Sequence, residues 1–291
     1  MRIVSVPNVS EGRDPQAIRS YTSAIEARDA RVLDVHSDAV HNRSVLTVGG
    51  AEEAIPDAMG ELAARTVGID MTRHTGVHPR LGGLDVCPIV AEGVSLERAV
   101  DVARRTGESI ANRTGLPVFL YGAAATRPET RALPDLRRGG LRALADRAMS
   151  GLRPDLGPPT IDVRQGVVCV GARGPLIAFN VLILSRLDVA RRISSEVRSS
   201  GGGPPGLRAL AFAMEGDEMQ ISLNLVEPAR TGIDQAFAAV NRSAKRHRAP
   251  LVATEIVGLV AERYLPDPNG EAARLLMRPG RSLESVWREL S

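Results

Sequence analysis

Histidines are the residues of this chain best suited to acid–base chemistry, and they are unevenly distributed. An imidazole changes its charge near neutral pH, so it can take up and release protons during a reaction. One histidine, His247, stands alone near the end of the chain. The other four lie between residues 36 and 78, beside acids, arginines and glycines: His36, His41, His74 and His78. Their concentration predicts a site in this part of the chain.

The string HTGVHPR, residues 74–80, bears on what chemistry that site performs. A helical zinc site places two histidines four residues apart on one helix face. Gly76 and Pro79 argue against a helix, so this ligand geometry does not apply and we expect no metal. Two alternatives remain: histidines that only order the loop, and histidines that exchange protons with a reacting nitrogen. Because the loop leads into a buried strand, where catalytic groups are often held, we favour proton exchange.

Composition and charge exclude several classes of protein. The chain has 291 residues, 43% of them hydrophobic and 24% charged, which predicts one large globular domain or two smaller ones. Only 3% are aromatic, too few for a base-stacking platform. The net charge is +3, and we interpret the basic run at 245–248 as a solvated helix end, so we expect neither a nucleic-acid partner nor a membrane partner.

Two cysteines, Cys87 and Cys169, lie in apolar runs that are typical of strands. The first residues lack the long apolar core of a signal peptide, and no apolar run approaches the 18 residues of a membrane span. These features predict buried free thiols and a cytoplasmic protein.

The first half of the chain alternates strand and helix patterns. We predict strands at 2–7, 31–37, 43–50, 84–90 and 117–122. A helix capped by Asp14, a second over 51–68 and a third over 95–115 separate them, and an arginine-rich helical stretch runs to about residue 150. The order of the first elements, β-α-β-β-α-β, is the split βαβ pattern of ferredoxin-like folds.

The second half repeats the theme after a Pro/Gly-rich passage at 151–166. Strands at 167–172 and 176–184 precede a helix at 187–200, a hairpin over 207–226, a helix at 232–247 and a strand at 250–260. We read this half as β-β-α-β-β-α-β and predict two subdomains, residues 1–172 and 173–291.

Several long strings resemble the formiminotransferase (glutamate formimidoyltransferase) family. They are VPNVSEG (6–12), HNRSVLTVGG (41–50), IDMTRHTGVHPRLGGLDVCP (69–88), GLPVFLYGAAA (115–125), PDLGPP (154–159), GVVCVGAR (166–173), AFNVLIL (178–184) and EIVGLV (255–260). The matches are collinear and span nearly the whole chain. No cyclodeaminase domain follows, so we expect a free-standing transferase.

The resemblance implies an α+β fold of two α/β-sandwich subdomains with a cleft between them, in a homodimer. It implies transfer of a formimino group from N-formimino-L-glutamate to N5 of tetrahydrofolate, the co-substrate, in histidine degradation. The catalytic histidine of the family falls on His78. Its folate-contacting segment falls on Gly157, Pro158, Pro159, Thr160, Ile161, Asp162, Val163, Arg164, Gln165 and Gly166.

Both substrates carry glutamate carboxylates, which arginines bind as planar forks. Arg43 and Arg80 are our candidates for that role, with surface ion pairs as the alternative. Asn8 could hold a polar substrate group or close a turn. Asp34 and Asp85, in predicted strands, could orient a histidine or cap a turn, and we count Asp34 among the substrate-binding candidates.

The chain departs from the family at several positions. His36 stands where the family has an acid, and we also count His36 among the substrate-binding candidates. Asp38, two residues along the strand, could replace that acid. Gly174 replaces a lysine, and the turn SSGGGPPG lacks the usual basic residues. These departures leave two alternatives open: a related transferase with another amidine or formyl donor, or a non-catalytic folate-binding homologue.

Overall fold

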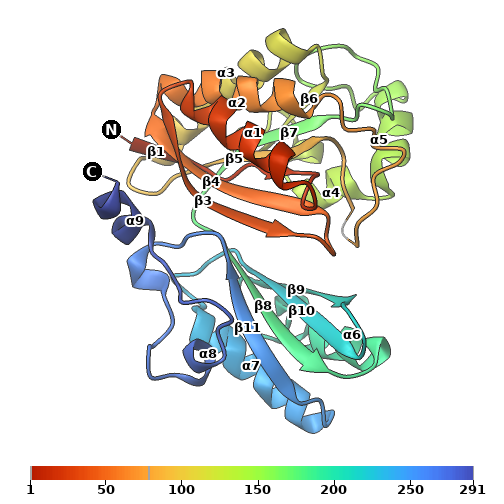
Figure 1. Ribbon diagram of the computed structural model, residues 1–291. Helices are drawn as coiled ribbons and strands as arrows, with labels where there is room; N and C mark the ends of the chain where they lie inside the picture. Colours follow the sequence, from red (N-terminus) through yellow and green to blue (C-terminus); the bar gives the residue numbers. More distant parts are fainter. Residues whose placement is uncertain (1, 78, 291) are drawn as a thin grey trace. The chain divides into compact units, whose positions relative to one another are not determined.

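The computed structural model describes residues 2–77 and 79–290 of the chain. The chain forms two compact units, which divide between Gly174 and Pro175 (Figure 1). Each unit combines a sheet with helices, which confirms the predicted α+β class with two α/β subdomains.

The first unit is built on a seven-stranded sheet. Its strands are β1 (Arg2–Ser5), β2 (Asn8–Val9), β3 (Ala30–Asp38), β4 (Arg43–Ala51), β5 (Leu84–Val90), β6 (Val118–Gly122) and β7 (Val168–Arg173). Its helices are α1 (Pro15–Glu26), α2 (Ala54–Thr66), α3 (Leu96–Thr114), α4 (Leu133–Arg137) and α5 (Gly140–Met149). β3 pairs with β4, and the order continues through β1 and β2 to β5, β7 and β6. The pairings are antiparallel except those of β7, which is parallel to β5 and β6.

The helices begin and end where the sequence supplies caps. Asp14 accepts hydrogen bonds from the backbone nitrogens of Gln16 and Ala17 at the start of α1, as predicted. Ser95 caps α3, and Gly115 ends it in the left-handed conformation with φ 68°. Helices α1, α2 and α3 bury their apolar sides in one core with the sheet, and α4 and α5 contribute to a second cluster with β5, β6 and β7. The part of the sheet formed by β5, β6 and β7 is therefore covered on both faces.

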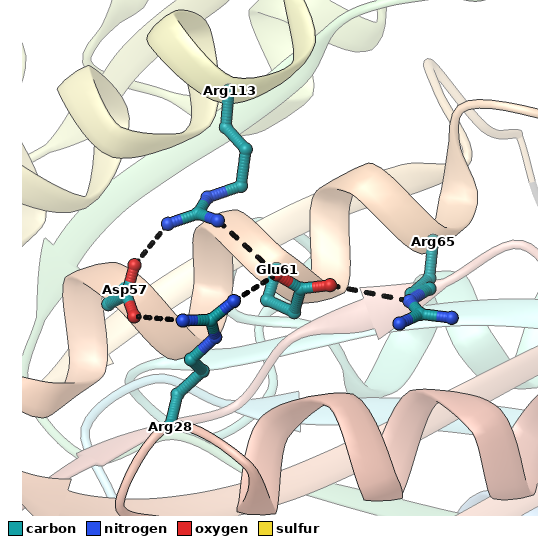
Figure 2. A network of polar contacts seen from close by, with 5 residues as sticks. All are labelled: Arg28, Asp57, Glu61, Arg65 and Arg113. Atoms are coloured by element: carbon teal, nitrogen blue, oxygen red, sulfur yellow. Dashed lines mark hydrogen bonds and ion pairs between the residues drawn. The ribbon is translucent and has the colours of Figure 1, made fainter.

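A network of arginines and acids links α2, α3 and a residue that follows α1 (Figure 2). We call it the helix network. Asp57, Glu61 and Arg65 lie on α2, Arg113 lies on α3, and Arg28 follows α1. Glu61 lies 3.0 Å from Arg28, 3.3 Å from Arg113 and 3.4 Å from Arg65. These ion pairs are partly exposed, so each adds little to stability.

Two predictions about strands are wrong. The strand expected at 2–7 ends at Ser5, and a separate strand, β2, follows at Asn8–Val9; Pro7 between them has no N–H for the ladder. The strand expected to open the second half, β7, belongs to the first sheet, where it fills the place between β5 and β6. Neighbouring strands of a sheet need not be close in sequence, so the periodicity of β7 could not reveal its partners.

The second unit has a four-stranded sheet in the order β11-β8-β10-β9, with every pairing antiparallel. Its elements are β8 (Ile177–Leu184), α6 (Leu187–Val197), β9 (Leu207–Ala213), β10 (Glu218–Leu225), α7 (Ile233–Arg246), β11 (Leu251–Val257), α8 (Glu271–Arg274) and α9 (Leu283–Glu289). From β8 to β11 the element order is β-α-β-β-α-β. Helices α6 and α7 share the core of this unit with one face of the sheet.

Candidate functional site

Strand ends of the first unit meet at one edge of its sheet. β2 ends at Val9, which lies opposite Ser44 of β4 and Leu84 of β5. β3 ends at Asp38, opposite Arg43 at the start of β4. β7 begins at this edge as well, because it runs parallel to β5. The segments that join these ends, including residues 69–83 and 157–166, are therefore neighbours in space.

The loop at 69–83 is held by the turn between β3 and β4. His74 Nε2 lies 3.2 Å from the carbonyl oxygen of Asn42, and Asn42 Nδ2 donates to the carbonyl oxygen of Thr75 at 3.0 Å. A Cβ on Gly76 would lie 2.4 Å from the His41 carbonyl oxygen, so this close approach requires glycine. The glycine of HTGVHPR thus serves to fit the loop against the turn.

His74 favours its neutral form in this setting. Burial lowers the pKa of His74, and the hydrogen bond with Asn42 only partly offsets the effect of burial. The positive charges of Arg80 and Arg13 lower it further. A neutral imidazole bound to a backbone carbonyl orders the loop.

The segment 157–166 lies directly against the same loop. The backbone nitrogen of Met71 donates to the carbonyl oxygen of Arg164 at 2.8 Å, and Arg164 Nη2 lies 3.2 Å from Asp70 Oδ2. At the other end Gly82 and Gly166 form an antiparallel bridge. The segment for which the family resemblance implies folate contact is therefore attached at two points to residues on either side of position 78.

Turns give this segment a defined shape. Gly166 has φ +80°, and a Cβ there would lie 2.2 Å from the Leu81 carbonyl oxygen. Gly157 has φ +79° and meets the Leu116 carbonyl oxygen at 2.4 Å in the same way. Between them Asp162 Oδ1 accepts a hydrogen bond from the backbone nitrogen of Arg164 at 2.8 Å. The remaining members follow these turns, with Ile161 packed against the second cluster and Pro159, Thr160 and Gln165 exposed; Pro158 and Val163 are half-buried.

A buried arginine cluster, made of Arg80, Asp85 and Arg137, lies at the start of β5. Arg80 Nη1 lies 3.1 Å from Asp85 Oδ2, and Arg137 Nη2 binds the same carboxylate oxygen. The other oxygen, Asp85 Oδ1, accepts a hydrogen bond from the backbone nitrogen of Leu81 at 2.8 Å. The side chains of Arg80 and Asp85 are 2% and 0% exposed. One carboxylate therefore joins the loop, β5 and α4.

Both arginines of the cluster stay charged at neutral pH. Burial lowers the pKa of Arg80 to about 10, although Asp85 acts in the opposite direction. For Arg137 burial is the largest single influence and also lowers the pKa, but the charges of Asp85, Cys169 and Tyr121 and the hydrogen bond to Asp85 together outweigh it, so the pKa is raised. Arg80 and Asp85 were expected as site residues from the sequence, whereas Arg137 was not. In an arginine-rich helical stretch, no sequence pattern distinguishes the arginine that faces inward.

The other candidates lie on the strands of the first unit. Asn8 is half-buried in β2 and donates to the carbonyl oxygen of Val6 at 3.1 Å, which is the turn contact weighed as its alternative. Asp34 lies in β3 opposite Thr47, and His36 is buried opposite Val45.

Arg43 and Asp38 face each other across the turn between β3 and β4. Asp38 Oδ1 accepts a hydrogen bond from the backbone nitrogen of His41 at 2.8 Å, and its other oxygen lies 3.8 Å from His41 Nε2. The carboxylate proposed to replace the family's acid therefore closes the turn that holds the loop.

His78 lies outside the described residues, so its role stays a prediction. The two cysteines are buried free thiols, as predicted. Burial raises the pKa of Cys87 to about 12 and raises that of Cys169 as well, so neither is suited to act as a thiolate nucleophile.

Residues 2–77 and 79–290 hold no group of three or more His, Cys, Asp or Glu side chains placed to bind a metal. Within the same residues, no helix is both long and apolar enough to span a bilayer.

Comparison with known proteins gives consistent matches along the chain. Residues 2–173 match the N-terminal subdomain of the formiminotransferase domain, and residues 178–269 match the formiminotransferase domain. A glutamate formimidoyltransferase of Streptococcus pyogenes serotype M1 is 34% identical over 268 residues, which cover 90% of each chain. One of Thermoplasma acidophilum is 37% identical over 273 residues, 90% of this chain and 89% of that protein. A formimidoyltransferase-cyclodeaminase of Sus scrofa is 36% identical over 90% of this chain and 50% of that protein.

Proposed function

Because the chain belongs to the formiminotransferase family, we propose that it transfers a formimino group from N-formimino-L-glutamate to N5 of tetrahydrofolate. The observation that carries this proposal is the attachment of residues 157–166 to the loop around position 78. Met71 and Gly82, on either side of that position, bond to Arg164 and Gly166. A folate bound along 157–166 would present its pterin close to that loop.

The reaction needs one group that both accepts and donates a proton. N5 of tetrahydrofolate attacks the amidine carbon and forms a tetrahedral intermediate. Its collapse breaks the bond to the glutamate nitrogen, which leaves well only as a protonated amine. We assign both transfers to His78: it takes the proton from N5 and delivers one to the leaving nitrogen, a contribution of about 10²- to 10⁴-fold in rate. Binding the two substrates side by side adds a proximity effect.

Arginines near the loop supply the recognition of glutamate carboxylates. Arg80 is buried in the arginine cluster, and Arg43 starts β4 at the same sheet edge. The positive charge of Arg43 acts on Arg80, second to burial among the influences that lower the pKa of Arg80. We assign both to the substrate carboxylates. Asn8, Asp34 and His36 stay substrate-binding candidates on the neighbouring strands.

Two further properties are proposed from the family resemblance alone. They are a role in histidine degradation and assembly as a homodimer; residence in the cytoplasm is also proposed, on the buried free thiols. Sedimentation of the purified chain tests the homodimer, and a monomer at micromolar concentration would contradict it.

The assay combines purified protein, tetrahydrofolate and N-formimino-L-glutamate, and follows 5,10-methenyltetrahydrofolate after acidification. We expect product with these substrates. Product formed only from another amidine or formyl donor would replace the proposed donor. Tetrahydrofolate binding without any turnover would indicate a non-catalytic homologue.

The first variant to test is His78→Ala. Its turnover should fall by roughly 10²-fold or more while tetrahydrofolate still binds, because the proton-transfer group is lost. His74→Ala is the matched control and should have a smaller effect, since His74 is neutral and bound to the backbone of Asn42. Near-normal turnover of the His78 variant would show that another group transfers the proton.

A further inference from the structure

The buried arginine cluster holds more positive than negative charge. Arg80 and Arg137 both bind Asp85, so the formal charges of the three residues sum to +1. All three side chains are largely or completely removed from water. A buried charge without a counter-ion is strongly disfavoured, so a fold that needed this cluster for stability alone would be better served by one arginine.

The cluster also offers more hydrogen-bond donors than acceptors. Nε and Nη2 of Arg80 and Nε of Arg137 are buried and have no hydrogen-bond partner among the described residues. Buried N–H groups are nearly always paired in folded proteins. A carboxylate supplies both missing features, because it carries one negative charge and two acceptor oxygens that match a guanidinium fork.

We propose that Arg137 is a specificity-determining residue that reserves Arg80 for a carboxylate of the substrates. Arg137 acts as the counter-ion of Asp85, and the positive charge of Arg80 then remains for the glutamate carboxylate of the formimino donor or of the folate. This inference rests on the proposed function for the identity of the ligand. The placement of the cluster supports it, since Asp85 is bonded to Leu81 in the loop that follows position 78.

A charge-restoring set of variants tests the proposal. Arg137→Met leaves the neutral pair of Arg80 and Asp85, so the net charge falls from +1 to 0. Asp85→Asn keeps an oxygen that can accept from Leu81 and raises the net charge to +2. The double variant returns to +1. Arg137→Lys keeps the charge without the fork, and Arg113→Met in the helix network is the control for loss of an arginine elsewhere.

Two measurements are made on each full-length variant. Calorimetry with glutarate, a simple dicarboxylate, measures binding without any reaction, and the transfer assay gives KM for each substrate separately. We expect Arg137→Met to weaken glutarate binding and raise one KM by about tenfold or more, with Arg137→Lys affected less. The double variant should recover most of the loss, and Arg113→Met should match the unmodified chain. The substrate whose KM rises identifies the source of the carboxylate.

The outcomes separate this inference from the proposed function. Unchanged glutarate affinity and unchanged KM values in folded Arg137→Met would overturn the carboxylate site while formimino transfer stands. Glutarate binding that depends on Arg137 in a chain without formimino transfer would support the site and overturn the function. A lack of glutarate binding by the unmodified chain would overturn the inference. If the variants that carry Asp85→Asn fail to fold, Arg137→Met and Arg137→Lys still decide it.

Discussion

The buried arginine cluster and the helix network use the same two kinds of residue in different surroundings. In the cluster, the side chains of Arg80 and Asp85 are 2% and 0% exposed. In the helix network of Figure 2, Arg28 is 39% exposed and Asp57 43%. Water screens the second set and is excluded from the first, so the same charges have different consequences.

The difference indicates which charges are informative about function. An exposed ion pair contributes at most about 1 kcal/mol, so the number of arginines in the helix network carries little meaning. A buried charge costs several kcal/mol unless it is paired. The excess positive charge around Asp85 is therefore the feature of this unit that calls for a ligand.

The largest difference is expected between acids of the two sets. Asp85→Asn leaves Arg80 and Arg137 without their shared carboxylate and should lower the free energy of unfolding by about 3–5 kcal/mol. Asp57→Asn, the matched substitution in the helix network, should cost less than about 1 kcal/mol. Urea unfolding followed by circular dichroism measures both. Similar losses for the two variants would contradict the contrast in burial.

A second pair of variants compares two glycines with positive φ. Gly166→Ala meets the Leu81 carbonyl oxygen, whereas Gly93, with φ +75°, has open space around it. The left-handed backbone alone should cost Gly93→Ala roughly 1–2 kcal/mol. Gly166→Ala should lose about 1–3 kcal/mol more through the clash, and it should weaken tetrahydrofolate binding as 157–166 moves from the loop. Thermal unfolding and a folate titration test this. Equal stability losses in the two variants would mean that the close packing contributes nothing.

The smallest effect concerns pH and the helix network. Desolvation opposes the charge of Glu61, but the hydrogen bond from Arg28, with help from Arg65 and Arg113, lowers the pKa of Glu61. The pKa of Glu61 is therefore lower in the folded chain than in the unfolded chain, where it is about 4.3. The stabilisation by these contacts is present above about pH 4.3 and is lost as pH falls through the pKa of Glu61 in the folded chain.

In the Glu61→Gln variant, the free energy of unfolding should therefore fall less steeply below about pH 4.3, and the difference from the unmodified chain should be less than about 1 kcal/mol. Unfolding measured between neutral and acidic pH checks the prediction, and added salt should reduce the effect. A pH dependence identical to that of the unmodified chain would show that Glu61 does not contribute to the loss of stability in acid.

Much of the fold could be predicted because its signals are local. Asp14 before an apolar helical pattern places the start of α1, and Gly115 places the end of α3. The helix boundaries in the arginine-rich stretch were harder to predict: the chain breaks after α4 at Arg137, and α5 begins only at Gly140, where Gly139 and Gly140 both have positive φ. The early end of β1 before Pro7 likewise shows that the exact ends of elements are hard to predict from the sequence.

The site was only partly predictable. The HTGVHPR loop could be named from its residues and the segment 157–166 from the family resemblance, and the fold places the two against each other. Arg137 could not be named, because it lies 52 residues from Asp85 in the sequence. Nothing in the pattern around α4 distinguishes a buried arginine from a solvated one.

By itself the sequence determined the elements, the family and the residue types that could move a proton or bind a carboxylate. These depend on periodicity, caps and contiguous motifs, which are properties of short stretches of chain. The tertiary structure decided that β7 enters the first sheet, that 157–166 lies against the loop at 69–83, and that Arg80 and Arg137 share Asp85. These depend on strand register and burial, because only the folded chain brings distant residues together and removes their charges from water.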